Sequence, residues 1–155
     1  MKSNITALLF TLLVFSINSR AQSKPNANLE EAKKTIAESN AIHFKLYLKN
    51  DGSIMKLYTD DACLLQPNAP ALCGYEQVSK FFKDAYNAGG VRDGKIITLN
   101  IYGEGNEYVT EEGLWQIFDG TGKMLDDGKY LAIWKKTKDG WKMFRDMPSS
   151  NHPPK

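Results

Sequence analysis

Residues Tyr58–Gly74 read YTDDACLLQPNAPALCG, and the rest of the chain is organised around this segment. Two short apolar runs flank the PNAP tetrapeptide at 67–70, whose residues favour a turn, so the segment predicts a β-hairpin. The first run ends at Gln66, and a new helical pattern begins at Tyr75. The hairpin therefore separates one helical region from the next.

The two cysteines of the chain, Cys63 and Cys73, lie equally far from Asn68 in this segment. In a hairpin centred on Asn68 they are opposed, and opposed residues can have Cα atoms about 4.5 Å apart, a separation that a disulfide spans. Two interpretations stay open, a disulfide or two buried free thiols, because the register is not fixed by the pattern. The cysteines and the two histidines show no metal-ligand spacing, so we predict no metal site.

The N-terminus has the pattern of a secretory signal peptide. Lys2 supplies a positive charge, an apolar run follows at 5–17, and Ser19 and Ala21 place small residues at the −3 and −1 positions of a cleavage site. The run is shorter than the ~20 residues of a spanning helix, which makes an uncleaved anchor the weaker alternative. We expect cleavage of 1–21, a linker at 22–28 and one periplasmic or secreted domain at 29–155, with no membrane attachment.

The charge balance argues against a nucleic-acid partner. The whole chain has 20 Lys and Arg against 18 Asp and Glu, a formal net charge of +2. Lys2 and Arg20 lie in the expected signal peptide, so 18 basic and 18 acidic residues remain after cleavage. A neutral domain lacks the basic surface that a phosphate backbone requires. We also expect no cofactor.

Beyond the linker, the hydrophobic period is first helical and then alternating. Helices are predicted at 29–49, with Asn28 as N-cap and Glu31 reaching back to it, at 53–58 and at 75–88. Strands are predicted at 95–102, 107–118, 124–136 and 141–147, separated by glycine-containing turns. Helices followed by a meander predict an α+β fold, with a curved antiparallel sheet wrapped around the N-terminal helix and two further helices.

The order and spacing of several short motifs resemble those of a known superfamily. The motifs are YTDDA at 58–62, LCG at 72–74, DDGKYL at 126–131 with Trp134, DGWK at 139–142 and RDM at 145–147. They are similar to the nuclear-transport-factor-2-like superfamily, in its SnoaL-like and ketosteroid-isomerase-like branch and an exported, mostly uncharacterised subgroup. The resemblance implies a cystatin-like cone with a cavity between the first helix and the sheet, and a homodimer through the other face of the sheet.

Isomerases of that branch use an Asp that shuttles a proton, together with a Tyr and a protonated acid that donate to the enolate oxygen. Counted from the matched motifs, these three positions fall on Gln66, Ile42 and Ala132. None of these residues can supply the corresponding group, and loss of the base alone costs about 10²–10⁴-fold in rate. The resemblance therefore implies a cone without the isomerase acids, and we assign no catalytic residue.

Several polar and aromatic side chains are expected to line the cavity. The same count from the matched motifs places Glu112 and Arg145 on the cavity side, where they either contact a ligand or form an ion pair. His43 is either a ligand contact or a histidine at the edge of a helix face, and Gln66 either offers its amide to a ligand or completes the turn. The predicted lining is His43, Tyr47, Gln66, Glu112, Gln116, Tyr130, Trp134 and Arg145.

Three functions are compatible with these features. The one we favour is an exported domain that binds a small, largely apolar molecule in the cone, with His43, Gln66 and Tyr130 as polar contacts. The second is an enzyme of altered chemistry, an isomerase, hydrolase or cyclase that uses Glu112 or His43. The third is a dimeric interaction module whose cavity is vestigial.

Overall fold

The computed structural model describes residues 26–153, so the expected signal peptide, most of the linker and residues 154–155 lie outside it. The elements are α1 (Ala27–Tyr47), the 3₁₀ helix η1 (Ser53–Leu57), β1 (Tyr58–Leu64), β2 (Leu72–Cys73), α2 (Tyr75–Gly89), β3 (Asp93–Tyr102), β4 (Tyr108–Phe118), β5 (Met124–Thr137) and β6 (Gly140–Ser150). No helix within this range is both long and apolar enough to cross a membrane.

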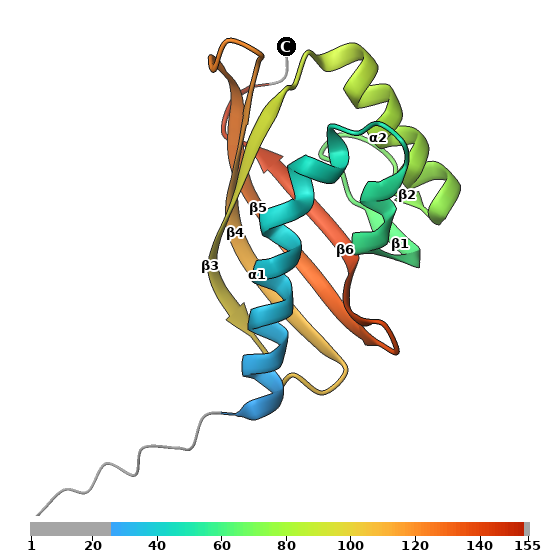
Figure 1. Cartoon of the computed structure of the whole chain (residues 1–155), viewed down its shortest axis with the longest axis vertical. Helices are drawn as coiled ribbons and strands as arrows, with labels where there is room; N and C mark the ends of the chain where they lie inside the picture. Colours follow the sequence, from blue (N-terminus) through green and yellow to red (C-terminus); the bar gives the residue numbers. More distant parts are fainter. Residues whose placement is uncertain (1–25, 154–155) are drawn as a thin grey trace, which may run out of the picture.

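The strands form one six-stranded sheet in the order β2-β1-β6-β5-β4-β3. Figure 1 shows α1 lying along this sheet, with η1 and α2 grouped beside β1 and β2. The predicted α+β fold, a curved sheet around the N-terminal helix with two further helices, is confirmed. The sheet is mixed rather than wholly antiparallel, because β1 lies parallel to β6. Hydrophobic alternation predicts strands but does not specify which strands become neighbours.

Helix α1 begins earlier than predicted, because Asn26 rather than Asn28 is its N-cap. The Asn26 side chain accepts hydrogen bonds from the backbone N–H groups of Asn28 (3.1 Å) and Leu29 (3.4 Å). Its side-chain nitrogen also donates to a backbone carbonyl in the β3–β4 loop, 2.8 Å away. Glu31 does not reach back to the cap but accepts from Lys136 on β5 at 2.9 Å. Tertiary contacts thus decide between two asparagines that are equally good caps.

The core lies between α1 and the concave face of the sheet. Ala32 and Ile36 of α1 are fully buried, as are Trp134 of β5 and Glu111 of β4. Burial alternates along the strands, so that odd-numbered residues of β4 and even-numbered residues of β5 face α1. This alternation decides which side chains reach the interior.

A β-bulge in β6 reverses the alternation near the end of the chain. The register of β5 and β6 shifts between Ile133 and Trp134, which leaves Phe144 as an extra residue. Phe144 and Arg145 consequently lie on the same, outer face, with the Arg145 guanidinium 3.6 Å from the centre of the Phe144 ring. Asp146 points inward. Without the bulge, Arg145 would occupy the inward position.

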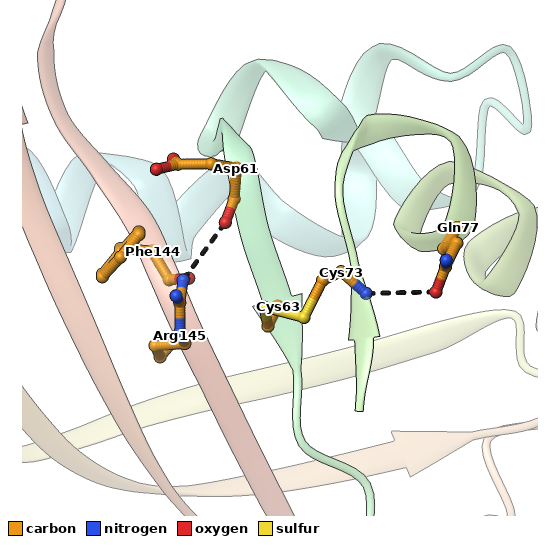
Figure 2. Close-up of a disulfide and its surroundings, with 6 residues drawn as sticks. All are labelled: Asp61, Cys63, Cys73, Gln77, Phe144 and Arg145. Carbon is orange, nitrogen blue, oxygen red and sulfur yellow. Dashed lines mark hydrogen bonds between the residues drawn. A yellow bond between two sulfur atoms is a disulfide. The ribbon is translucent and has the colours of Figure 1, made fainter. Parts of the chain in front are cut away.

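The β1–β2 hairpin is closed by a disulfide between Cys63 and Cys73, which are paired across the two strands. Their Cα atoms are 4.1 Å apart, and Figure 2 shows the bridge between the strands. The structure therefore has the hairpin register that opposes the two cysteines, and of the two interpretations it has the disulfide rather than two free thiols. On the far side of the bridge, the Cys73 backbone N–H donates to Gln77 of α2 at 3.2 Å. The bridge therefore fastens β2 and the start of α2 to the sheet.

Opening this disulfide should lower the free energy of unfolding by about 2–3 kcal/mol, because the unfolded chain gains the entropy of the opened loop. Urea unfolding with and without a thiol reductant measures the change. The double variant Cys63→Ser/Cys73→Ser is the control, since its unfolding should be the same with and without reductant. Equal stability of the natural protein under both conditions would contradict the prediction.

Candidate functional site

A cavity of about 280 Å³ lies between α1, α2 and the concave face of the sheet. Most of its wall is apolar, and the aromatic members are Phe44, Tyr47, Phe81, Phe82, Trp115 and Tyr130. The polar members are Asn40, His43, Gln66 and Asp146. No lysine or arginine is among the described residues that line it. The cavity is thus an aromatic chamber with a few polar groups and one carboxyl group.

Inward-facing glycines make room for three of these rings. A Cβ atom on Gly94 would overlap the ring of Phe44, and one on Gly113 would overlap the ring of Tyr130. A third glycine, at position 128, similarly leaves space for Trp115. The rings can therefore lie close against the backbone of the sheet, where any larger residue would displace them.

Beside the cavity, the Glu111 carboxylate is fully buried and accepts four hydrogen bonds. Its Oε1 accepts from Asn40 (2.7 Å), Thr98 (2.6 Å) and the Tyr130 hydroxyl (2.7 Å), and its Oε2 accepts from Trp134 Nε1 (2.9 Å). A buried carboxylate is tolerated when donors replace its water in this way. Both oxygens are engaged, so Glu111 positions its neighbours and does not face the cavity as a free acid.

Among the described residues that line the cavity, Asp146 is the one acid. Its Oδ2 accepts a hydrogen bond from the buried Tyr58 hydroxyl at 2.9 Å. The pKa of the Asp146 carboxyl group is raised to about 6, chiefly by burial; the Tyr58 hydrogen bond opposes this rise, and the nearby Glu111 adds to it. No other hydrogen bond joins this carboxyl group to the described residues, so Oδ1 is available to a bound molecule.

His43 of α1 lies in the same wall, with its ring edge-on to Phe44 (5.2 Å between centroids) and Phe82 (6.3 Å). Burial disfavours the imidazolium and lowers the pKa of His43 to about 4. The ring is therefore neutral near pH 7, with one nitrogen that donates and one that accepts. It adds a hydrogen-bonding group to the cavity but no positive charge.

Of the eight residues predicted to line the cavity, His43, Tyr47, Gln66 and Tyr130 do so, and Glu112, Gln116, Trp134 and Arg145 do not. Glu112 and Gln116 are on the outer face because β4 points its odd-numbered residues inward, and the Glu112 carboxylate accepts from Tyr102 at 2.7 Å. Arg145 is turned outward by the bulge, and its Nη1 donates to the Asp61 carbonyl at 3.1 Å. The predicted Glu112–Arg145 pair is therefore wrong.

The predicted place of Trp134 in the cavity lining is also wrong. Its side chain is fully buried in the core, where Nε1 donates to Glu111. Sequence reasoning missed Glu111 and Asp146. The sequence contains a signal for Glu111, because Glu111, Gly113 and Trp115 are alternate residues of β4 and therefore lie on the same face. The inward position of Asp146 has no such signal, because only the bulge in β6 turns this side chain inward.

The three positions matched to the isomerase groups are placed as follows. Gln66 lines the cavity, Ile42 is 42% exposed on α1, and Ala132 is buried on the inner face. Ala132 is paired with Glu111 on one neighbouring strand and with Asp146 on the other. Two acids therefore flank the position where the family acid was expected, without occupying it.

Outside the cavity, Asp126, Asp127 and His152 are the one group in residues 26–153 with candidate metal-ligand atoms within 4.8 Å of one another. His152 Nε2 lies 2.7 Å from Asp127 Oδ1, and Asn151 donates to Asp127 Oδ2 at 2.8 Å. These hydrogen bonds lower the pKa of Asp127. The group fastens the exit of β6 to β5, which accounts for its arrangement without an ion.

No family model and no curated protein matches this sequence. Solved structures do match. An NTF-2 like protein of unknown function from Shewanella oneidensis has a TM-score of 0.64 at 16% identity, over 76% of this chain and 98% of that one. A ketosteroid isomerase-like protein from Erwinia carotovora atroseptica has a TM-score of 0.60 at 19% sequence identity, over 77% of this chain and 96% of that one. A domain of unknown function with a cystatin-like fold from Nostoc punctiforme has a TM-score of 0.66 at 12% sequence identity, over 79% of this chain and 78% of that one. The chain therefore has the NTF2-like, cystatin-like fold that its motifs predicted.

Replacing Glu111 with Gln should lower the free energy of unfolding by at least about 2 kcal/mol, because an amide N–H₂ would face a buried donor. The neighbouring Glu112→Gln is a matched control, since Tyr102 can still donate to the amide oxygen on the exposed face. It should change the stability by no more than about 0.5 kcal/mol. Urea unfolding of both variants makes the comparison, and a larger loss in Glu112→Gln would refute the assignment of faces.

Proposed function

We propose that this domain binds a small, largely apolar molecule in the cavity between α1, α2 and the sheet. The observation that carries the proposal is an open cavity of about 280 Å³ in the interior. Protein interiors are normally close-packed, and ligand sites begin near 300 Å³. The aromatic wall suits an apolar body, and His43, Gln66 and Tyr130 offer it hydrogen bonds.

We also propose that the domain is exported. The N-terminal segment has the three regions of a signal peptide. The Cys63–Cys73 disulfide supports the same conclusion, because such bridges form and persist in oxidising compartments. The ligand would then be met in the periplasm or outside the cell.

Binding is favoured over an enzyme of altered chemistry. Glu112, the first acid considered for that role, faces away from the cavity and is bonded to Tyr102. His43 lines the cavity, but no hydrogen bond from the described residues orients its ring as a catalytic base requires. The residues at the isomerase positions, Gln66, Ile42 and Ala132, supply none of the groups of the family reaction.

Filling the cavity should abolish binding without unfolding the domain. The neutral fluorescent probe N-phenyl-1-naphthylamine should bind the natural protein with enhanced emission, because an aromatic cavity excludes water from it. Ala85 lines the cavity, so Ala85→Trp should weaken the probe's affinity at least about 10-fold by occupying its space. Ala88→Trp, one turn further along the same helix and exposed, is the matched control. Equal affinities of the two variants would contradict the proposal.

We further propose a homodimer through the outer face of the sheet. Apolar side chains that are more than a third exposed gather there on four neighbouring strands, namely Ile97, Leu114, Leu131, Ile133 and Met147. Two pairs of them are direct strand neighbours. The same face carries Glu112 and Arg145, so two copies related by a two-fold axis can oppose unlike charges. An apolar face of this kind on a soluble domain marks an interaction surface.

Replacing Leu131 with Glu should convert the dimer to a monomer, because the charge would be buried at the centre of the interface. Sedimentation velocity at tens of micromolar protein measures the mass. Ile42→Glu, at an equally exposed apolar position on α1, should leave the dimer intact. A natural protein that sediments as a monomer would refute this proposal without affecting the one on binding.

A further inference from the structure

The cavity has an uncompensated negative charge. The Asp146 carboxyl group lines it with one oxygen available, and the Glu111 carboxylate lies close enough to raise the pKa of Asp146. Lysine and arginine are missing from the described lining residues. In an apolar surrounding, such a charge interacts strongly with a polar or charged group of a bound molecule, because little water screens it.

The titratable groups that face Asp146 from the neighbouring elements do not neutralise it. β1 contributes the Tyr58 hydroxyl, β4 contributes Glu111 and β5 contributes Tyr130, and none of these can carry a positive charge. From α1 comes His43, which is neutral because its pKa is lowered to about 4. The residues that α2 places in the wall, Phe81, Phe82 and Ala85, do not titrate.

Two arginines directly adjoin a lining residue in the sequence. Arg145 precedes Asp146 and is turned to the outer face, and Arg92 follows Val91. The Arg92 guanidinium lies over the ring of Tyr86, 4.8 Å from the centroid, and its Nη1 donates to the Val91 carbonyl at 2.7 Å. The residue is exposed. Its charge is therefore held at the surface and does not enter the chamber.

The aromatic wall favours the same sign of charge as the carboxylate does. Six aromatic side chains line the cavity. The faces of aromatic rings attract cations, and clusters of such rings recognise organic ammonium groups in particular. Two independent features, the carboxylate and the rings, thus point to one class of ligand.

We propose that the cavity selects an organic cation, a compact apolar molecule with one ammonium group that pairs with Asp146 among the aromatic rings. This inference rests on the proposed binding function and names the class of its ligand. The ammonium donates to the free oxygen of Asp146, while Tyr58 holds the other oxygen in place. Molecules with a carboxylate, such as fatty acids, are rejected because no cation in the wall receives their charge.

The affinity for such a ligand depends on pH in a definite direction. The ammonium pairs with the ionised form of Asp146, whose pKa is about 6 in the free protein. Below that pH the carboxyl group must lose a proton before it can pair, so affinity falls about 10-fold per pH unit. An aliphatic ammonium stays protonated over this range.

Three probes that share one apolar body test the proposal: 2-naphthylmethylamine, 2-naphthylmethanol and 2-naphthoic acid. Their dissociation constants for the natural protein at pH 7.5 are measured by titration calorimetry. We expect the amine to bind at least 10-fold more tightly than the alcohol, and the acid most weakly. Between pH 7.5 and pH 5 the ratio of amine to alcohol affinity should fall about 10-fold in the natural protein. This last measurement needs no variant.

Asp146→Asn isolates the charge, because the amide keeps the size and still accepts from Tyr58. The affinity of this variant for the amine should fall at least 10-fold, to its affinity for the alcohol, and should no longer change with pH. Its affinity for the alcohol should stay within about 3-fold of that of the natural protein. Asp60→Asn, at an exposed position on β1, should behave as the natural protein.

An alcohol or acid that binds as tightly as the amine would overturn the assignment of ligand class and leave the binding function standing. Amine selectivity that persists in Asp146→Asn would overturn the same assignment. Failure of all three probes and of N-phenyl-1-naphthylamine to bind would overturn both proposals.

Discussion

The buried carboxylate of Glu111 is the interaction on which the rest of the interior depends. It accepts from Asn40 of α1, Thr98 of β3, and Tyr130 and Trp134 of β5, while its own backbone belongs to β4. One acid thus fixes a helix and three strands relative to one another. A carboxylate inside a protein is costly unless its donors are in place, so this arrangement specifies one geometry more strictly than apolar packing alone. Tyr130 links it to the cavity, because the same side chain forms part of the wall.

The second constraint is the bulge in β6. By inserting Phe144, it places Arg145 outside and Asp146 inside, and so exchanges a cation for an acid at the cavity wall. Bulges often redirect a side chain beside a functional site. Here the consequence is electrostatic. A chamber with Arg145 in that place would suit an anion, whereas one with Asp146 suits a cation or a hydrogen-bond donor.

These two features also explain how the fold differs from the isomerase pattern that its motifs resemble. Ala132 is the residue to which the motif resemblance assigns the isomerase acid, and two acids of this chain, Glu111 and Asp146, are its partners on the strands at either side. Glu111 has both oxygens engaged by the protein, and Asp146 keeps one oxygen for the cavity. Glycines at 94, 113 and 128 let aromatic rings approach the backbone, so that the wall is aromatic where the strands have no side chain. The cavity wall of this chain is therefore aromatic, and Asp146 is the acid among its described lining residues.

The sequence by itself determined the α+β fold and the order of its helices and strands, because periodicity and turn residues are local signals. The register that opposes Cys63 and Cys73 was left open by the sequence and was decided by the structure. The sequence also placed His43, Tyr47, Gln66 and Tyr130 in the cavity, since these follow from the resemblance and from helix and strand phase. Only the tertiary structure decided that β1 lies parallel to β6 and that Asn26 caps α1, because both depend on contacts between distant segments. It alone turned Arg145 outward and Asp146 inward, because a bulge is a register shift between two strands and leaves no mark on either strand alone.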